Sequence, residues 1–243
     1  MIRLRWVFLG TVVVAGVSVA AGQTPSASPP LTALQRSAVE RGEPVQILEL
    51  LPTSPWPRSI VYQFINATPE QCAAVLSDYD LQSTYVPRLV LSRVIGHRGA
   101  NVTDVEYVVK IPVFPDERSV SRQRVSDDSG AYRIEWHTVF SDSQAKGSRT
   151  NGSATFSAMP NSRLGRIGTL MVHDQAVTPN SVFARVPYVR NKAIGASRDA
   201  AAAIAHQVER ERGADQDLLA RQVARLHDAL ASHPDTGKVT QQP

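Results

Sequence analysis

The sequence predicts an α+β fold in which a curved antiparallel sheet wraps around a long C-terminal helix. Two observations predict this fold. Six runs with two-residue alternation follow one another between residues 88 and 177, and their short connections indicate an antiparallel meander. Apolar residues spaced three and four apart then extend over residues 189–208, which predicts a long helix covering one face of the sheet. A chain of 243 residues, 42% of them hydrophobic, is long enough to build one such core.

The first 22 residues have the three parts of a secretory signal peptide. Arg3 and Arg5 form a basic start, an apolar stretch runs from Trp6 to Ala21, and small residues end it. We therefore expect an exported protein, periplasmic or extracellular. The alternative is an uncleaved N-terminal segment that tethers the protein to a membrane, although this apolar stretch is short for a span.

Residues 23–30 are rich in Thr, Ser, Ala and Pro, which predicts a flexible spacer. Residues 31–57 then form an N-terminal extension with one helix and one strand. The helix is expected over 31–41, because Gly42 supplies a stop, and the strand over 45–51, which prolines end.

The main domain is predicted at residues 58–212. It begins with a strand over 58–65 and a helix over 69–77, where Thr68 is a capping residue and Pro69 suits the first helical position. Cys72 lies in the apolar stripe of this helix and is the one cysteine of the chain. No intramolecular disulfide can form, and we expect Cys72 to be a small buried side chain.

The strands of the meander are expected at 88–95, 102–111, 118–125, 131–140, 153–159 and 167–177. A further C-terminal helix is predicted over 213–232 by an apolar stripe of Leu219, Val223, Leu226 and Leu230. The polar tail at 233–243 is expected to be disordered.

Four short segments of the main domain form a recognisable set: Ala67-Thr68-Pro69-Glu70-Gln71, Val75-Leu76-Ser77-Asp78-Tyr79-Asp80, Tyr85-Val86-Pro87 and Ser92-Arg93-Val94. Together with the order of elements over residues 60–208, they resemble the polyketide cyclase/dehydrase and lipid-transport superfamily. These START-like helix-grip (SRPBCC) proteins include coenzyme Q-binding carriers of the START type. The resemblance implies a helix-grip fold in which the long helix and the sheet enclose a mostly apolar cavity.

Members of this superfamily carry lipids, isoprenoid quinones or sterols, and some act as aromatases or cyclases on polyketides. The resemblance therefore leaves the chemistry open.

A set of mostly apolar side chains lines the interior if the more apolar face of each strand points at the long helix. These residues are Tyr107, Val109, Ile134, Trp136, Phe140, Phe156, Leu170 and Val172 from the strands, with Val189, Ile194 and Ser197 from the helix. An apolar strand face is buried with or without a cavity, so the same residues also fit a filled core.

Arg122 and His137 are the predicted polar contacts for a ligand. Facing inward, Arg122 would hold an anionic or carbonyl group, whereas facing solvent it would pair with Asp104 or Glu106 across the sheet. His137 and His173 lack a third ligand at a suitable spacing, so no metal site is predicted.

Several other functions lack their sequence signals. No Ser lies in a Gly-x-Ser-x-Gly elbow, and residues 147–152 lack the Lys of a phosphate-binding loop, so neither a catalytic residue nor a cofactor is assigned. The net charge of +4 is small and dispersed, so we expect no nucleic-acid partner. Asp78, Tyr79 and Asp80 follow a helix end, where such residues cap the helix and close a turn.

We expect a carrier that holds a lipid, an isoprenoid quinone or a similar hydrophobic molecule in its cavity and contacts a membrane transiently during exchange. Two alternatives stay open: a cyclase- or aromatase-type enzyme with polar groups in the cavity, and a non-catalytic scaffold with a filled core. The interior separates them, because a carrier needs an apolar void, an enzyme a polar-lined void and a scaffold none.

Overall fold

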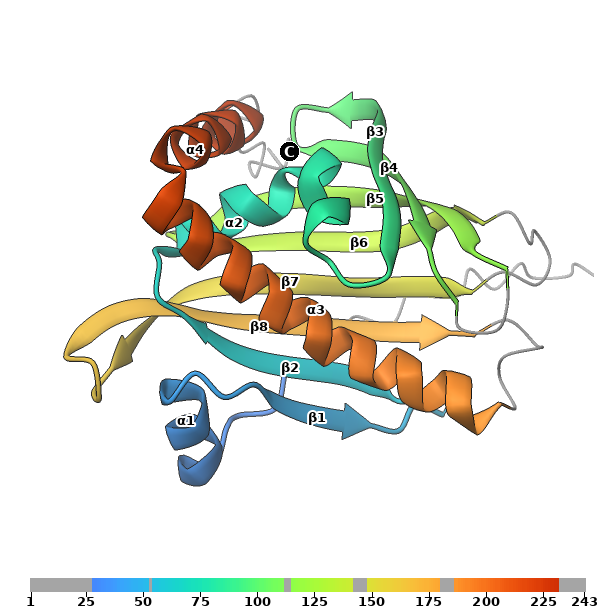
Figure 1. The fold of residues 1–243 in the computed structure, drawn as a ribbon, viewed down its shortest axis with the longest axis horizontal. Coiled ribbons are helices and arrows are strands. Elements are labelled where there is room, and N and C mark those ends of the chain that lie inside the picture. Colours follow the sequence, from blue (N-terminus) through green and yellow to red (C-terminus); the bar gives the residue numbers. More distant parts are fainter. Residues whose placement is uncertain (1–27, 53, 112–114, 142–147, 180–185, 232–243) are drawn as a thin grey trace, which may run out of the picture.

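The computed structural model describes residues 28–52, 54–111, 115–141, 148–179 and 186–231 (Figure 1). The predicted signal peptide at 1–22 and the predicted tail at 233–243 lie outside the described residues, as does most of the spacer at 23–30. None of the helices within these ranges is long and apolar enough to cross a membrane.

One eight-stranded antiparallel sheet forms the framework, in the order β1-β2-β8-β7-β6-β5-β4-β3. The predicted six-stranded meander is confirmed as β3 to β8, and β2 and β1 extend the sheet beyond β8. The strands are β1 (Val45–Glu49), β2 (Arg58–Ile65), β3 (Leu89–Gly99), β4 (Val102–Val109), β5 (Glu117–Asp128), β6 (Ala131–Ser141), β7 (Arg149–Asn161) and β8 (Arg166–Thr178).

The hairpin between β5 and β6 shows how local chemistry sets this topology. Ser129 and Gly130 both have positive φ angles, 53° and 88°, as a two-residue hairpin turn requires. The Asp127 carboxylate accepts a hydrogen bond from the backbone N–H of Gly130 at 2.9 Å and holds the turn closed.

Helix α2 spans Pro69–Ser77, the predicted range. Thr68 accepts a hydrogen bond from the backbone of Gln71, and the Gln71 side chain accepts one from the backbone of Thr68, which is a capping box. Helix α1 (Ala33–Glu40) begins with the same arrangement. Both starts are set by residues within one turn of the helix.

The long helix predicted over one face of the sheet is confirmed as α3 (Pro187–Ala214), which runs diagonally over β2, β8 and β7 (Figure 1). Helix α4 (Gln216–Ala231) follows it and packs beside α2. A short 3₁₀ helix, η1 (Tyr79–Thr84), connects α2 to β3 and was not predicted.

The sheet buries apolar side chains on both faces. The core beneath α2, α3 and α4 contains Val61, Ile134, Phe156, Met171 and Ile204 among others. A second core on the opposite face contains Val39 of α1 with Ile60, Tyr62, Phe64 and Met159, and Leu170 and Val172 pack against it. The extension predicted at 31–57 is therefore part of the fold, since its helix covers a face of the sheet and its strand pairs with β2.

Candidate functional site

A cavity of about 240 Å³ lies between α3 and the sheet, and we call it the α3 cavity. It is lined by Leu76, Gln82, Val86, Tyr107, Val109, Ser119, Ser121, Gln123, Ile134, Trp136, Thr138, Thr150, His173, Gln175, Ala200 and Ile204. No Asp, Glu, Lys or Arg is among these residues. The part of the lining that the structure describes is therefore uncharged, and it combines an apolar wall with a wall of hydroxyl and amide groups.

The polar wall begins with three alternate residues of β5. Ser119, Ser121 and Gln123 point to the helical side because side chains alternate across a strand. Gln123 Nε2 donates to Ser121 Oγ at 3.2 Å and to Tyr107 Oη at 3.3 Å. The Tyr107 hydroxyl donates to Gln82 Oε1 at 2.9 Å, and Gln82 Nε2 donates to the carbonyl of Leu76 at 2.7 Å. This chain of bonds connects η1 to the sheet across the cavity.

Burial keeps the titratable groups of the cavity neutral. It raises the pKa of the Tyr107 hydroxyl well above its usual range. It also lowers the pKa of His173 to about 4, although neighbouring Asp174 acts in the opposite direction. Both groups can exchange hydrogen bonds with a ligand at pH 7 without carrying charge.

His173 is 6% exposed and stacks against Trp136, with ring centroids 5.2 Å apart and a 39° angle between the planes. Its Nδ1 has no hydrogen-bond partner among the residues that the structure describes. A buried polar atom without a partner costs free energy, which a bound group or water would recover. His173 is therefore the lining residue best placed to recognise an oxygen or N–H of a ligand.

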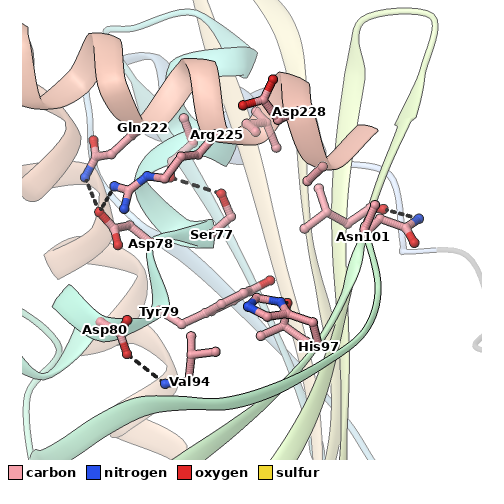
Figure 2. A pocket seen from close by; sticks show the side chains of 16 residues that line it. Ser77, Asp78, Tyr79, Asp80, Val94, His97, Asn101, Gln222, Arg225 and Asp228 are labelled. Atoms are coloured by element: carbon pink, nitrogen blue, oxygen red, sulfur yellow. Dashed lines mark hydrogen bonds and ion pairs between the residues drawn. The ribbon is translucent and has the colours of Figure 1, made fainter. Parts of the chain in front are cut away.

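A second cavity, of about 460 Å³, lies between α4, η1 and the β3–β4 hairpin, and we call it the α4 cavity (Figure 2). Its lining residues are Ala74, Ser77, Asp78, Tyr79, Asp80, Val94, His97, Ala100, Asn101, Thr103, Val125, Gln222, Arg225, Leu226, Asp228 and Ala229. The Asp80 carboxylate accepts a hydrogen bond from the backbone N–H of Val94 at 2.7 Å, and Asp78 accepts from Arg225 Nη2 at 2.6 Å. Both contacts are to distant elements, and the Asp78 side chain makes no capping hydrogen bond to η1, so the predicted capping and turn-closing role is not what these carboxylates do: they connect this segment to α4 and β3.

Two solved structures have a similar fold. A STAR-related lipid transfer protein from Xanthomonas axonopodis aligns with a TM-score of 0.57 at 12% identity, over 68% of this chain and 93% of its own. Human STARD10 aligns with a TM-score of 0.59 at 11% identity, over 87% of this chain and 92% of its own. The chain has a START-like helix-grip fold. No protein-family model and no curated protein sequence matches it.

Of the residues predicted to line the interior, the α3 cavity contains Tyr107, Val109, Ile134 and Trp136. Phe156 is fully buried in the core rather than in the lining. Helix α3 contributes Ala200 and Ile204, which were not among the predicted lining residues.

The prediction was wrong for Phe140, which is 47% exposed. The pairing of β5 with β6 shifts between Val120 and Ser121, so that Ser121 pairs with Thr138 and Val120 with Phe140. This bulge adds Val139 to β6 and turns Phe140 to the outer face. The alternation that holds from Tyr132 to Thr138 therefore ends before Phe140.

Leu170 and Val172 were also assigned to the wrong face. They pack in the second core on the opposite side of the sheet, while Met171 and His173 face α3. Leu170 and Val172 pack against the cluster that includes Val39 of α1, so both faces of β8 are covered.

Val189, Ile194 and Ser197 of α3 lie outside the lining. Val189 packs against Trp56, and the carbonyl of Ile194 accepts a hydrogen bond from Gln46 of β1 at 2.8 Å. Ser197 is buried. The helix crosses the sheet diagonally, so its first turns lie nearer the β1 edge and its middle turn meets the cavity (Figure 1).

The two predicted polar contacts lie outside the cavity. Arg122 is on the outer face, where its Nε donates to Asp104 Oδ1 at 2.7 Å. Of the two predicted alternatives, this is the one in which Arg122 faces solvent and pairs across the sheet. His137 pairs with Arg122 in the sheet register and is exposed, whereas His173 faces the interior. Within the described ranges, no three His, Cys, Asp or Glu side chains are placed to hold a metal.

Proposed function

We propose that the protein binds a neutral, oxygen-bearing hydrophobic molecule in the α3 cavity and carries it. The observation that supports this proposal is a cavity between α3 and the sheet, partly open to solvent, whose described lining residues include no charged side chain. A carboxylate or phosphate placed there would lose its hydration without gaining a counter-charge, so a neutral ligand is favoured.

The arrangement of the lining supports a ligand with two distinct sides. Val109, Ile134 and Ile204 offer apolar contact, which stabilises a bound ring or chain in proportion to the buried area. His173 and Gln175 offer hydrogen bonds to a carbonyl or hydroxyl group. A quinone ring or another oxygenated lipid head has this combination.

The size of the cavity restricts the part of the ligand that it encloses. A volume of about 240 Å³ is below the roughly 300–1,000 Å³ of a typical drug-sized site. A ring with a short substituent fits this volume, whereas a lipid with two long chains would leave most of its chain length outside. The lipid-transfer name of the Xanthomonas protein supports the lipid class for this chain as well.

The first test is native mass spectrometry of the purified protein, followed by lipid extraction and identification of the bound molecule. We expect one neutral, oxygen-containing lipid or quinone per protein. A protein that purifies empty and binds no added quinone or neutral lipid would contradict the proposal.

A pair of variants on α3 tests the location of the ligand. Ala200→Leu adds a side chain inside the lining, and Ala202→Leu adds the same group on the exposed side of the helix. We expect occupancy to fall by about tenfold in Ala200→Leu and to stay unchanged in Ala202→Leu, because only the first fills the cavity. Equal occupancy in both would place the ligand elsewhere.

A cyclase-type activity is the second candidate, and the buried polar network favours it. The Tyr107 hydroxyl and the His173 imidazole, whose Nδ1 has no partner within the described ranges, belong to residues that line the same cavity, where an acid and a base could act on a carbonyl substrate. If the protein is an enzyme, His173→Gln should lose turnover of a polyketide-like substrate while still binding it. Substrate recovered unchanged from the wild-type protein would favour the carrier. The scaffold alternative is less favoured, because it needs a filled interior.

We further propose that the protein is exported, on the basis of the signal-like sequence at residues 1–22. N-terminal sequencing of protein from fractionated cells tests this. A mature chain that begins near residue 23 would support cleavage, and a full-length chain in the membrane fraction would support the tethered alternative.

A further inference from the structure

The outer face of β3, β4 and β5 carries a concentration of arginine side chains. The β5 arginines alternate with Ser119, Ser121 and Gln123, which face α3, so they point to the other side of the sheet. We call this surface the arginine face, and it consists of Arg93 and Arg98 from β3 with Arg118, Arg122 and Arg124 from β5. Within the described ranges, α1 is the one helix on this side, and it packs over β2 and β8 instead (Figure 1).

A buried carboxylate of β4 holds two of these arginines in place. Glu106 accepts a hydrogen bond from Arg93 Nη2 at 2.5 Å and another from Arg118 Nε. The side chain of Glu106 is 3% exposed, whereas those of Arg93 and Arg118 are 60% and 55% exposed. The carboxylate therefore lies beneath two guanidinium groups, which keep further N–H donors at the surface.

Asp104 repeats this arrangement two residues earlier on β4. It accepts hydrogen bonds from Arg98 Nε at 2.8 Å and from Arg122 Nε at 2.7 Å, and its side chain is 7% exposed. Each carboxylate is shared by two arginines, so each group of three side chains keeps one positive charge. A partner that approaches this surface meets guanidinium groups first, because the negative charges lie below them.

Arg124 adds a charge that no described carboxylate neutralises. Its side chain is exposed, and it makes no ion pair with any residue that the structure describes. Its register partner on β6 is Glu135, which is paired with Arg133 instead, with Nε 2.9 Å from Oε1. The arginine face therefore has an excess of positive charge, which fits an anionic partner.

A large apolar side chain on the same side of the sheet indicates the kind of partner. Phe140 of β6 is exposed and pairs with Val120, which lies between Arg118 and Arg122 on β5. Exposed aromatic rings beside basic side chains are typical of surfaces that contact a membrane, where guanidinium groups bind lipid phosphates and the ring enters the headgroup layer.

A nucleic acid fits this surface less well. Sheets that bind single strands use several aromatic rings for stacking on bases. Phe140 is the one Phe, Tyr or Trp that the described part of β3–β6 places on the outer face, since Tyr107, Tyr132 and Trp136 face the helices.

The position of the α3 cavity gives this surface a use. Val109, Ser119 and Thr138 line the cavity at the same ends of β4, β5 and β6 where Arg118 and Phe140 lie on the outer face. We propose that the arginine face binds the anionic surface of a phospholipid membrane and brings this end of the α3 cavity close to it. The proposal rests on the carrier function, because a carrier of a hydrophobic molecule must meet the membrane that supplies or receives it.

The test is cosedimentation of the purified full chain with two kinds of vesicle. One kind is pure phosphatidylcholine, and the other contains equal parts of phosphatidylcholine and phosphatidylglycerol, which adds negative charge. We expect at least about tenfold tighter binding to the anionic vesicles, and we expect high salt to weaken it. Equal binding to both kinds of vesicle would overturn the proposal.

Two double variants connect the binding to the arginine face. Arg118→Gln with Arg124→Gln removes two charges from this face. Arg198→Gln with Arg221→Gln removes the same charge from exposed positions of α3 and α4, on the opposite side of the sheet. We expect the first to weaken binding to anionic vesicles by about tenfold or more, and the second by less than about twofold. Any contribution of residues 1–22 is the same in both chains.

Two further measurements complete the test. Phe140→Ser should weaken vesicle binding by about threefold, because it removes the apolar contact. The thermal midpoint of the Arg118 and Arg124 double variant should stay close to that of the wild type, since Glu106 keeps Arg93 as a partner. Weaker binding would then not reflect unfolding.

The proposal is overturned if the two double variants bind anionic vesicles equally well. It is also overturned if the protein binds a single-stranded oligonucleotide but not the vesicles, since the partner would then be a nucleic acid. Vesicle binding is measured without the hydrophobic ligand, so its failure leaves ligand binding in the α3 cavity untouched, and an empty cavity would not change the vesicle result.

Discussion

The indole of Trp136 lies directly over Gly152 of the neighbouring strand, where there is no room for a side chain. The two residues pair in the register of β6 and β7. A Cβ at Gly152 would lie 2.6 Å from Cζ2 of Trp136 and 2.5 Å from the carbonyl oxygen of Asp174. Since Trp136 also stacks on His173, this glycine sets the position of two lining residues of the α3 cavity.

Gly152→Ala should therefore destabilise the protein and disturb the cavity. We expect the free energy of unfolding, measured in urea, to fall by about 1–3 kcal/mol, because an added methyl group must displace the indole or the backbone. Gly195→Ala is the control, since nothing lies within 4 Å of its added Cβ and it sits inside α3. That variant should be as stable as the wild type or more stable by up to about 1 kcal/mol. Equal stability of Gly152→Ala and the wild type would refute the close contact.

His173 should make stability depend on pH in a defined window. Its pKa is about 4 in the folded protein and near 6.5 when the group is solvated, because burial disfavours the charged imidazolium. Between these values the unfolded chain binds a proton that the folded chain does not, so stability is full above about pH 6.5 and falls as the pH decreases toward 4. Urea unfolding at a series of pH values measures this.

Two histidine variants isolate the contribution. His173→Gln should flatten the decrease between pH 6.5 and 4, whereas His137→Gln should not, since His137 is exposed on the outer face. If His173→Gln retains the full slope, the imidazole is not buried in its neutral form.

Cys72 should be chemically inert in the native protein. The thiol is fully buried in α2, and burial raises its pKa to about 12, while the thiolate is the reactive form. With the disulfide reagent DTNB at pH 8, we expect no release of chromophore from native protein and one equivalent from protein unfolded in urea. Prompt reaction of native protein would show that α2 opens readily.

The boundaries of the elements were predictable where local chemistry decides them. The capping box of Thr68 and Gln71 lies within one turn of α2, and the predicted helix has the observed ends. The order of the strands followed from alternation and turns, since each connection between the strands of the meander joins neighbours.

The face of a strand depends on partners that are distant in sequence, and there the prediction was less successful. Phe140 changed face because of a bulge that exists only when β6 pairs with β5. Leu170 and Val172 were misassigned because α1, more than a hundred residues earlier, covers the other side of β8.

The polar side of the α3 cavity was missed for a related reason. An alternation of Ser119, Ser121 and Gln123 has the pattern of a solvent-facing strand, and only the packing of α3 and η1 turns it into a lining.

The ion pairs of Asp104 on the outer face should contribute measurably to stability. Its side chain is 7% exposed and accepts hydrogen bonds from Arg122 Nε at 2.7 Å and Arg98 Nε at 2.8 Å. The bond from Arg122, followed by that from Arg98, lowers the pKa of Asp104 to about 2. Because the folded value is below the usual 3.8, the stabilisation is present above about pH 4 and is lost as the pH falls toward 2.

Asp104→Asn keeps the size of the side chain but removes the charge that both guanidinium groups face. We expect a loss of about 1 kcal/mol in the free energy of unfolding at pH 7, a modest value because both arginines reach solvent. The difference from the wild type should shrink in high salt and toward pH 2, where the wild-type carboxylate is also neutral. Glu43→Gln breaks the exposed pair with Arg41 and should cause no measurable change. A difference that persists unchanged in high salt and at low pH would assign the effect of Asp104→Asn to packing rather than to charge.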